Sequence, residues 1–270
     1  MDALLISDLS VPAAMPRISE AVSEEWLAPL AAFPLSAMTC RRVARASFPA
    51  CLAQMDAVLS AGEREHWMEM RAVSKRRQEW LLGRYAAKDA VRLLIARHIG
   101  VQLPPAEIEI VPDPYGRPLA AGSWQRHMRI RPAISITHSQ GTAVALASLA
   151  AGEEVGIDLE CLDQRRENFE TIAFSVDERA LLAALPPEWS LRLWCAKEAL
   201  AKALGRGFSA GIQAFHITRA ESAGGIVQME LRAAALQQFP RLAGQTMIAH
   251  TAREADYVFS VAIYRQGAVT

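Results

Sequence analysis

One long helix is predicted over residues 74–99, where apolar side chains recur at helical spacing. Leu81, Tyr85 and Val91 fall on one face of this segment. Gly100 follows the last apolar residue and suits the left-handed position that ends many helices. The segment is long enough to cover a sheet, and we expect it to be a main element of the fold.

Two further helices are predicted in the second half of the chain. Ser175 and Glu178 form a capping box, which predicts a helix that continues over 179–185. The next helix is expected over 191–204, and Gly205 closes it.

Alternation of apolar and polar positions predicts several strands. The clearest case is 133–138, where period-2 alternation is typical of a half-buried strand. Residues 143–149 are its expected pairing partner. The remaining predicted strands cover residues 108–111, 155–160, 215–218, 226–231, 247–250 and 257–264.

A short internal echo suggests how these elements are organised. Residues 87–90 read Ala-Lys-Asp-Ala, residues 196–199 read Ala-Lys-Glu-Ala, and each lies in a predicted helix that several strands follow. We therefore predict an α+β fold of two similar halves packed as a pseudo-dimer. The expected divisions are a peripheral segment 1–60, an N-terminal half 61–150 and a C-terminal half 151–270.

Composition limits the classes of function. The 270 residues are 51% hydrophobic and 21% charged, which is typical of a globular protein. Twenty-nine basic residues balance 29 acidic ones, so binding nucleic acid through bulk positive charge is excluded. The four cysteines form no Cys-x-x-Cys pair, and neither a signal peptide nor a membrane span is predicted. We expect a cytoplasmic protein.

Asp158 and Glu160 are the first candidate functional residues. On a strand, positions i and i+2 share a face, so the two carboxylates are expected side by side while Ile157 and Leu159 face the core. Paired carboxylates repel unless a cation lies between them, and such oxygen ligands suit Mg²⁺. The alternative is a strand whose charged face is simply solvated.

The second candidate is the helix segment Trp194–Lys202. Glu198 and Lys202 are four residues apart and share one helical face, whereas Lys197 projects elsewhere. They could both face one charged substrate. The alternative is a surface ion pair worth about 0.3–0.5 kcal/mol.

A third candidate lies where the strand 133–138 ends, at Thr137-His138. A histidine can donate to phosphate, and Gly141 allows close approach of the backbone. The alternative is an ordinary turn histidine. Arg84 and Lys88 add positive charge to the long helix, and a solvated helix face is their alternative.

These motifs together resemble the 4′-phosphopantetheinyl transferase family. The resemblance rests on Gly156-Ile157-Asp158-Leu159-Glu160 and on Trp194-Cys195-Ala196-Lys197-Glu198-Ala199-Leu200-Ala201-Lys202, 40 residues apart from Asp158 to Glu198. Gly116-Arg117-Pro118 and Ser135-Ile136-Thr137-His138-Ser139 are similar to two further family motifs, in the expected order. The length and the two halves resemble the monomeric, surfactin-synthetase-activating branch.

The resemblance implies an activity and its partners. This family transfers 4′-phosphopantetheine from coenzyme A to a serine of an apo acyl or peptidyl carrier protein, and it releases adenosine 3′,5′-bisphosphate. It implies Mg²⁺ as cofactor, coenzyme A bound by the N-terminal half, and metal and phosphate bound by the C-terminal half. The stretch 169–185 is the expected carrier contact. The natural carrier and its pathway are left open.

The resemblance also implies a role for each site residue. The metal ligands would be Asp158, Glu160 and Glu198. Glu198, or a water held by the carboxylates, would be the base, while Lys202 would neutralise the phosphate or protonate the leaving group. The coenzyme A-binding set would be Arg84, Lys88, Arg117, Thr137, His138, Lys197 and Lys202.

Two other functions compete with this interpretation. An inactive coenzyme A-binding module would bind coenzyme A without turnover on any carrier. A Mg²⁺ phosphohydrolase would use the same carboxylates on water, and it would release adenosine bisphosphate without an acceptor protein.

Overall fold

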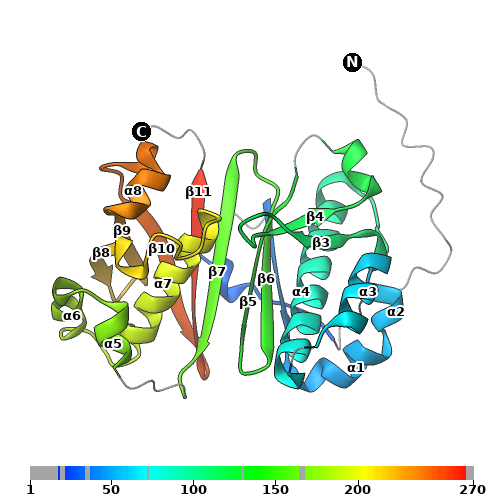
Figure 1. Ribbon diagram of the computed structural model, residues 1–270, viewed down its shortest axis with the longest axis horizontal. Helices are drawn as coiled ribbons and strands as arrows, with labels where there is room; N and C mark the ends of the chain where they lie inside the picture. The colour runs from blue at the N-terminus through cyan, green and yellow to red at the C-terminus, as the bar shows by residue number, and fades with distance from the viewer. Residues whose placement is uncertain are drawn as a thin grey trace.

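The computed structural model describes residues 18, 22–33, 37–71, 73–128, 131–163 and 168–265. The chain forms two halves, each built from one antiparallel sheet and one long helix (Figure 1). The sheets lie side by side in the centre, and the helices α4 (Ser74–Ile99) and α7 (Trp189–Ala203) cover them from outside. This arrangement confirms the predicted α+β class with two similar halves.

The N-terminal sheet has the order β1-β2-β6-β5-β4-β3 among the described residues, and neighbouring strands are antiparallel. Helix α4 packs on β2, β5 and β6 and buries Leu81, Tyr85 and Leu94. The strands are β1 (Glu24–Glu25), β2 (Met38–Val43), β3 (Glu109–Pro112), β4 (Pro118–Ala121), β5 (Ala133–Ser139) and β6 (Thr142–Ser148). The shorter helices are α1 (Phe48–Ala53), α2 (Met55–Val58) and α3 (Ala61–Glu69), with 3₁₀ turns at Ala28–Leu30, Arg45–Ser47, Pro105–Glu107 and Ser123–His127.

The C-terminal sheet has the order β7-β11-β10-β9-β8 in the part of the chain that the structure describes. Helix α7 packs on β7, β10 and β11. The strands are β7 (Glu153–Cys161), β8 (Phe215–Glu221), β9 (Ile226–Leu231), β10 (Met247–Glu254) and β11 (Tyr257–Arg265). The shorter helices are α5 (Phe169–Ala173), α6 (Val176–Leu182) and α8 (Ala234–Gln238), with 3₁₀ turns at Ile212–Ala214 and Pro240–Leu242.

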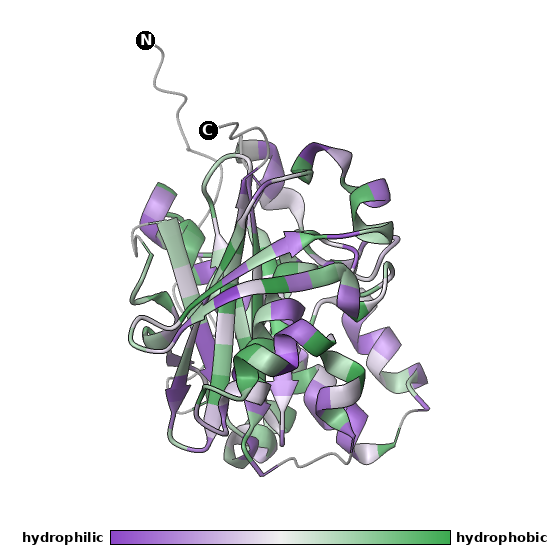
Figure 2. Ribbon diagram, turned by 90° about the vertical axis from the view of Figure 1, so that its left-hand side faces the viewer, coloured by the Kyte–Doolittle hydropathy of each residue, from purple (hydrophilic) through white to green (hydrophobic). Residues whose placement is uncertain are grey.

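The apolar side chains form three cores. One lies between each sheet and its long helix. The third joins the halves, and it includes Met38 and Leu146 from the N-terminal sheet and Ile157, Leu159 and Phe259 from the C-terminal one. Figure 2 shows hydrophobic stretches along the strands and hydrophilic ones on the peripheral helices. The third core therefore holds the two halves together through apolar contacts between their sheets.

The helix predicted over 74–99 is confirmed at both ends, and Gly100 is left-handed with φ 69°. The capping box of Ser175 and Glu178 is also confirmed. The predicted pairing of 133–138 with 143–149 is the β5–β6 hairpin. These features depend on local patterns, which the sequence displays directly.

The expectation that residues 1–60 are peripheral is wrong for β2. This strand lies inside the N-terminal sheet between β1 and β6, and its Met38, Cys40 and Val43 are almost completely buried. Its Met-Thr-Cys-Arg-Arg-Val sequence shows no alternation, because both faces of the strand are covered. Arg41 forms an ion pair with Asp89 inside the fold, so this charged residue does not indicate a solvent-exposed strand.

The glycine of the Gly-Ile-Asp motif is required by the contact between β7 and α7. A Cβ atom at Gly156 would overlap the backbone carbonyl of Ala199 and crowd the amide of Ala203. We expect Gly156→Ala to destabilise the protein by at least the upper end of about 1–3 kcal/mol, because backbone atoms cannot give way as side chains do. Urea unfolding would measure this. The same substitution at Gly224, whose Cβ would meet only flexible Ile226 carbons, is the control.

Candidate active site

Asp158 lies at the junction of the two halves. Its side chain is on the opposite face of β7 from Ile157 and Leu159, as predicted, and the residue is 6% exposed. Asp158 Oδ1 accepts hydrogen bonds from Lys202 Nζ (2.7 Å) and Thr137 Oγ1 (3.0 Å). Asp158 Oδ2 is buried and has no hydrogen-bond partner among the described residues. A buried, unpaired carboxylate oxygen is costly, which points to a cation or donor supplied by a ligand.

Helix α7 places Glu198 and Lys202 next to this carboxylate. Lys202 Nζ also donates to the carbonyl of Ile157 at 3.1 Å. Burial lowers the pKa of Lys202, but Asp158 and Glu198 outweigh that effect and raise it above its ordinary value. Burial raises the pKa of Glu198 to about 7; Lys202 opposes this shift, and the neighbouring Asp158 and Glu160 add to it. The ammonium therefore stays charged, and Glu198 can exchange a proton near neutral pH.

The arrangement of the carboxylates suits a magnesium ion that a bound substrate helps to coordinate. Among the described residues, no three His, Cys, Asp or Glu side chains stand ready as a complete metal cage. Mg²⁺, however, is commonly bound by one or two carboxylates together with water and substrate phosphates. The unpaired Oδ2 of Asp158, with Glu160 and Glu198 as electrostatic neighbours, suits that mode of binding.

We expect Glu198→Gln to stabilise the metal-free protein above pH 7. The folded pKa of Glu198 is raised to about 7, so the folded chain holds a proton that the unfolded chain has already lost, and stability falls as the pH rises from about 4.5 to 7. The variant removes that loss and should gain about 1–3 kcal/mol at pH 8 and nothing below pH 4. Denaturant unfolding across this range measures the gain. Glu170→Gln, at an exposed position, should show no such dependence on pH.

The other face of β5 borders a second pocket. Side chains alternate along β5, so Thr137 faces β7 while Ile136 faces α4, where its Cγ2 lies near Gly83. A cavity of about 300 Å³ is lined there by Arg84 and His138, together with Arg76, Glu79, Trp80, Gly83, Ile110, Val111, Pro112, Gly116, Pro118 and Ile136. The structure thus places Arg84 and His138 in the lining of one cavity.

The side chains of this pocket suit a phosphorylated, partly aromatic ligand. The guanidinium of Arg84 stacks over the Trp80 ring at 4.6 Å, and its buried Nε lacks a hydrogen bond within the described chain but lies 3.6 Å from Glu63 Oε1. The side chain of His138 is 50% exposed, and its Nδ1 lies 3.6 Å from a Glu79 carboxylate oxygen. Trp80 was not singled out from the sequence, because a tryptophan at helical spacing looks like an ordinary core residue.

Arg117 lies near the site but is engaged by acidic partners. Its Nη1 pairs with Glu154 at 2.8 Å and its Nε lies 3.4 Å from Asp113. Its side chain is 28% exposed and contacts the position of Gly205, where α7 ends. Through its contacts with Glu154 and Gly205, Arg117 connects the β3–β4 turn to the C-terminal half.

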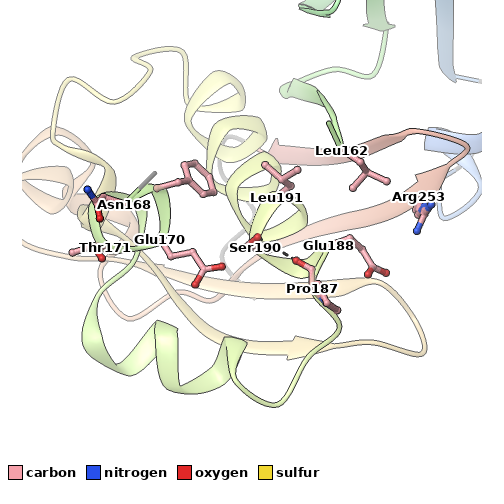
Figure 3. A pocket seen from close by; sticks show the side chains of 10 residues that line it. Leu162, Asn168, Glu170, Thr171, Pro187, Glu188, Ser190, Leu191 and Arg253 are labelled. Carbon is pink, nitrogen blue, oxygen red and sulfur yellow. Dashed lines mark hydrogen bonds between the residues drawn. The ribbon is translucent and has the colours of Figure 1, made fainter. Parts of the chain in front are cut away.

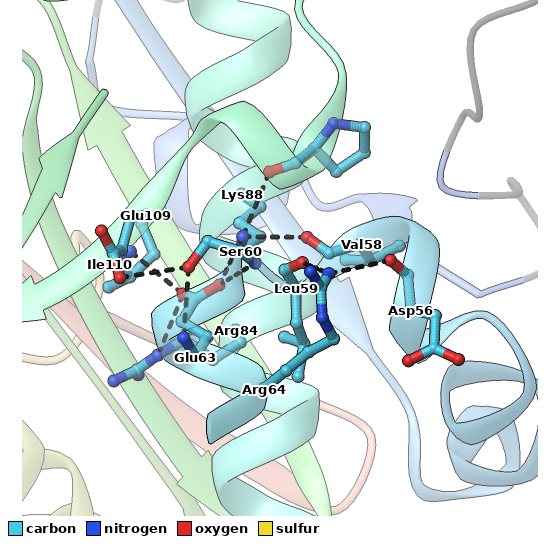
Figure 4. A network of polar contacts seen from close by, with 11 residues as sticks. Asp56, Val58, Leu59, Ser60, Glu63, Arg64, Arg84, Lys88, Glu109 and Ile110 are labelled. Carbon is cyan, nitrogen blue, oxygen red and sulfur yellow. Dashed lines mark hydrogen bonds and ion pairs between the residues drawn. The ribbon is translucent and has the colours of Figure 1, made fainter. Parts of the chain in front are cut away.

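Lys88 and Lys197 are buried in ion pairs with described residues, which differs from their predicted role in binding coenzyme A. Lys88 Nζ pairs with Glu63 and donates to the carbonyls of Val58 and Pro105 (Figure 4). Its side chain is completely buried. The surroundings of Lys88 therefore satisfy its charge inside the N-terminal half.

Lys197 repeats this arrangement in the C-terminal half. It pairs with Glu178 at 2.8 Å and donates to the carbonyl of Ala173 at 3.1 Å, and both charged side chains are 0% exposed. Glu178 also accepts from the backbone amide of Ile217, just as Glu63 accepts from Ile110. Each pair joins a capped helix, a long helix and a strand, so the repeated lysine is structural.

The N-terminal half contains an altered counterpart of the carboxylate site. By the sequence echo, Asp89 stands where the C-terminal half has Glu198. Asp89 is 1% exposed, and it pairs with Arg41 at 2.6 Å and with Arg92 at 2.7 Å. Arg41 lies on β2, which is next to β6 as β7 is next to β11. The guanidinium of Arg41 lies beside Asp89, the counterpart of Glu198. The two halves are therefore similar in fold but differ in the polar groups at this position.

The fold and the site define a two-half α+β protein with a carboxylate–lysine cluster where the halves meet. Residues 154–262 match the model of the 4′-phosphopantetheinyl transferase superfamily. The match includes Asp158, Glu160, Glu198 and Lys202.

Individual relatives cover smaller parts of the chain. A holo-[acyl-carrier-protein] synthase of Leuconostoc citreum is 33% identical over 85 residues, which span 32% of this chain and 59% of that protein. A holo-(acyl-carrier-protein) synthase structure from Bacillus anthracis, in complex with CoA (3′,5′-ADP), is 25% identical, with TM-score 0.36, over 42% of this chain and 95% of that chain. The ACPS–CoA complex of Chronobacterium ammoniagenes is 29% identical, with TM-score 0.35, over 41% and 93%.

Proposed function

We propose that this protein transfers 4′-phosphopantetheine from coenzyme A to a serine of an apo carrier protein. The observation that carries the proposal is the set of Asp158, Lys202 and Glu198 at the junction of the halves, within the matched superfamily region. The relative from Leuconostoc citreum is named as a holo-[acyl-carrier-protein] synthase. The pocket of Arg84, Trp80 and His138 supports binding of the nucleotide end of coenzyme A.

The transfer exchanges one phosphorus–oxygen bond for another. The carrier serine oxygen forms a bond to the phosphorus of the phosphopantetheine phosphate, and the bond to adenosine 3′,5′-bisphosphate breaks. The serine is a weak nucleophile until its proton is removed. Glu198, with its pKa raised to about 7, or a water held by the carboxylates, takes that proton. Lys202 neutralises the phosphate or protonates the leaving oxygen.

Asp158, Glu160 and Glu198 are the residues that would hold a magnesium ion. When bound, such an ion supplies electrostatic stabilisation of the phosphate charge. Asp158 has an unpaired oxygen available for this role. Thr137 and Lys202 fix the other oxygen of the same carboxylate.

A groove beside the carboxylate strand is the proposed approach of the carrier protein. Figure 3 shows this cavity of about 680 Å³ between α5, the start of α7 and the ends of β7 and β10. Ile172 and Val176 are large apolar side chains nearby in the sequence, and they are 67% and 72% exposed. Exposed apolar residues in 169–185 are what a docking surface requires. This supports the predicted carrier contact.

The proposal includes the monomeric branch and a cytoplasmic location. Both halves and the junction between them come from one chain, so the site needs no second copy. None of the helices in the described ranges combines the length and apolarity needed to cross a bilayer. The proposed coenzyme-binding half is 61–150 together with β2, which lies in the same sheet, and the proposed catalytic half is 151–270.

The test is intact-protein mass spectrometry of an apo peptidyl carrier protein incubated with this chain, coenzyme A and Mg²⁺. We expect a mass gain of one phosphopantetheine on the carrier serine, and no gain with EDTA. Binding of coenzyme A without modification of peptidyl, acyl or polyketide carriers would instead indicate a binding module. Release of adenosine bisphosphate without an acceptor would indicate a phosphohydrolase.

A further inference from the structure

Strand β7 is the edge of the C-terminal sheet, and side-chain hydroxyls of the other half cover that edge. The backbone amides of Ile157, Leu159 and Cys161 point away from β11. They donate to Ser135 Oγ at 3.0 Å, Thr137 Oγ1 at 3.2 Å and Ser139 Oγ at 3.1 Å, respectively. All three acceptors lie on one face of β5, because they are two residues apart. An edge strand needs such cover to avoid unpaired amides.

Two of these hydroxyls also reach the carboxylates of the proposed site. Thr137 Oγ1 donates to Asp158 Oδ1 at 3.0 Å, and Ser139 Oγ donates to Glu160 Oε2 at 3.2 Å. A hydroxyl has one proton and two lone pairs, so accepting from an amide and donating to a carboxylate gives it a fixed direction. Among the described residues, the Ser135 hydroxyl accepts a hydrogen bond from the Ile157 amide and contacts no carboxylate.

We propose that Thr137 and Ser139 are positioning residues that hold Asp158 and Glu160 in the orientation required for a divalent cation. The inference deepens the proposed function and rests on it. Thr137 and Lys202 together occupy Oδ1 of Asp158, which leaves Oδ2 as the oxygen available to the cation. Hydrogen-bonded partners of metal ligands typically change metal affinity or activity 10- to 100-fold when removed. Thr137 thus acts through a carboxylate, in addition to its predicted place near coenzyme A.

The first measurement is Mn²⁺ binding in the presence of saturating coenzyme A, followed by the electron paramagnetic resonance of free Mn²⁺. Mn²⁺ takes the same oxygen ligands as Mg²⁺. We expect Thr137→Val and Ser139→Ala each to weaken Mn²⁺ binding about tenfold. Ser135→Ala is the matched control, because it removes an equivalent cover of β7 without a carboxylate contact, and it should stay within about twofold of the wild type. Thr137→Ser keeps the hydroxyl and should bind Mn²⁺ as the wild type does.

The second measurement is unfolding by urea without metal. Each of the three hydroxyl deletions should lower stability, because each leaves one amide of β7 uncovered. A coupling between Thr137→Val and Asp158→Asn in a double-mutant cycle is expected even without metal, and none between Ser135→Ala and Asp158→Asn.

The outcomes separate this inference from the proposed function. If Thr137→Val and Ser139→Ala bind Mn²⁺ as tightly as Ser135→Ala does, the positioning role is overturned while the metal site stands. If the wild type itself binds no Mn²⁺, the metal part of the proposed function fails and the inference fails with it. If Thr137→Val does not fold, comparing Mn²⁺ binding by Ser139→Ala and by Ser135→Ala tests the positioning role.

Discussion

Asp158→Asn is expected to lower the rate of phosphopantetheine transfer by about 10³-fold or more. The substitution keeps the size of the side chain but removes the charge that Oδ2 offers to a cation and that Oδ1 offers to Lys202. Loss of about 4 kcal/mol of transition-state stabilisation corresponds to this factor. Asp158→Ala should be at least as inactive. The rate is measured by mass spectrometry of the carrier protein at fixed enzyme concentration.

The fold should survive these substitutions, which distinguishes a lost site from a lost protein. Circular dichroism of the Asp158 variants should match the wild type, because Lys202 keeps its bond to the Ile157 carbonyl, whereas their melting temperature should fall with the loss of the Asp158–Lys202 ion pair. Asp256→Ala removes an exposed carboxylate from the β10–β11 turn and should leave transfer unchanged. Near wild-type turnover of Asp158→Asn would show that this residue is not required for the reaction.

Lys197→Met is expected to destabilise the protein by about 3–5 kcal/mol, because removing one member of a buried ion pair leaves the other charge unpaired. Glu178 and Lys197 are both 0% exposed. Replacing both, as Glu178→Leu with Lys197→Met, should cost less than the single change. Lys75→Met, at a pair with Glu79 in which the lysine is 65% exposed, should change stability by less than about 1 kcal/mol. Urea unfolding of the wild type and these three variants at pH 7 measures the differences.

The same pair should make the protein sensitive to acid. Burial raises the pKa of Glu178, but the amide of Ile217, Lys197 and the amide of Ser175 outweigh this and hold it below its ordinary value. A carboxyl with a lowered folded pKa contributes stability above its unfolded pKa of about 4.5, and that contribution is lost as the pH falls below it. The stability of Glu178→Leu with Lys197→Met should therefore depend less on pH in this range. An unchanged pH dependence would assign acid sensitivity to other groups.

The sequence predicted those elements whose pattern is local. The helix 74–99 has helical periodicity and a terminal glycine, and both of its ends were found. The strand carrying Asp158 and Glu160 alternates, so the common face of its carboxylates was also found. Strand β2 was missed because burial on both faces removes alternation, and β4 was missed because it begins with Pro118.

Function-bearing residue types could not be separated from structural ones by sequence alone. Lys88, Lys197 and Lys202 have the same chemistry and lie on long helices, yet only Lys202 reaches the carboxylate site. The face of a helix decides this, and the neighbours on that face come from distant segments. Glu63 and Glu178, which neutralise the two buried lysines, lie 25 and 19 residues before them in the chain.

By itself the sequence determined the α+β class, the two halves and the two pairs Asp158/Glu160 and Glu198/Lys202, because these follow from local periodicity. That the two pairs form one site was implied by the resemblance. Only the tertiary structure decided that hydroxyls of β5 hold the carboxylates of β7. It also placed Arg41 beside Asp89 in the N-terminal half. Contacts between separate sheets depend on how two halves pack, and no pattern within either segment records that packing.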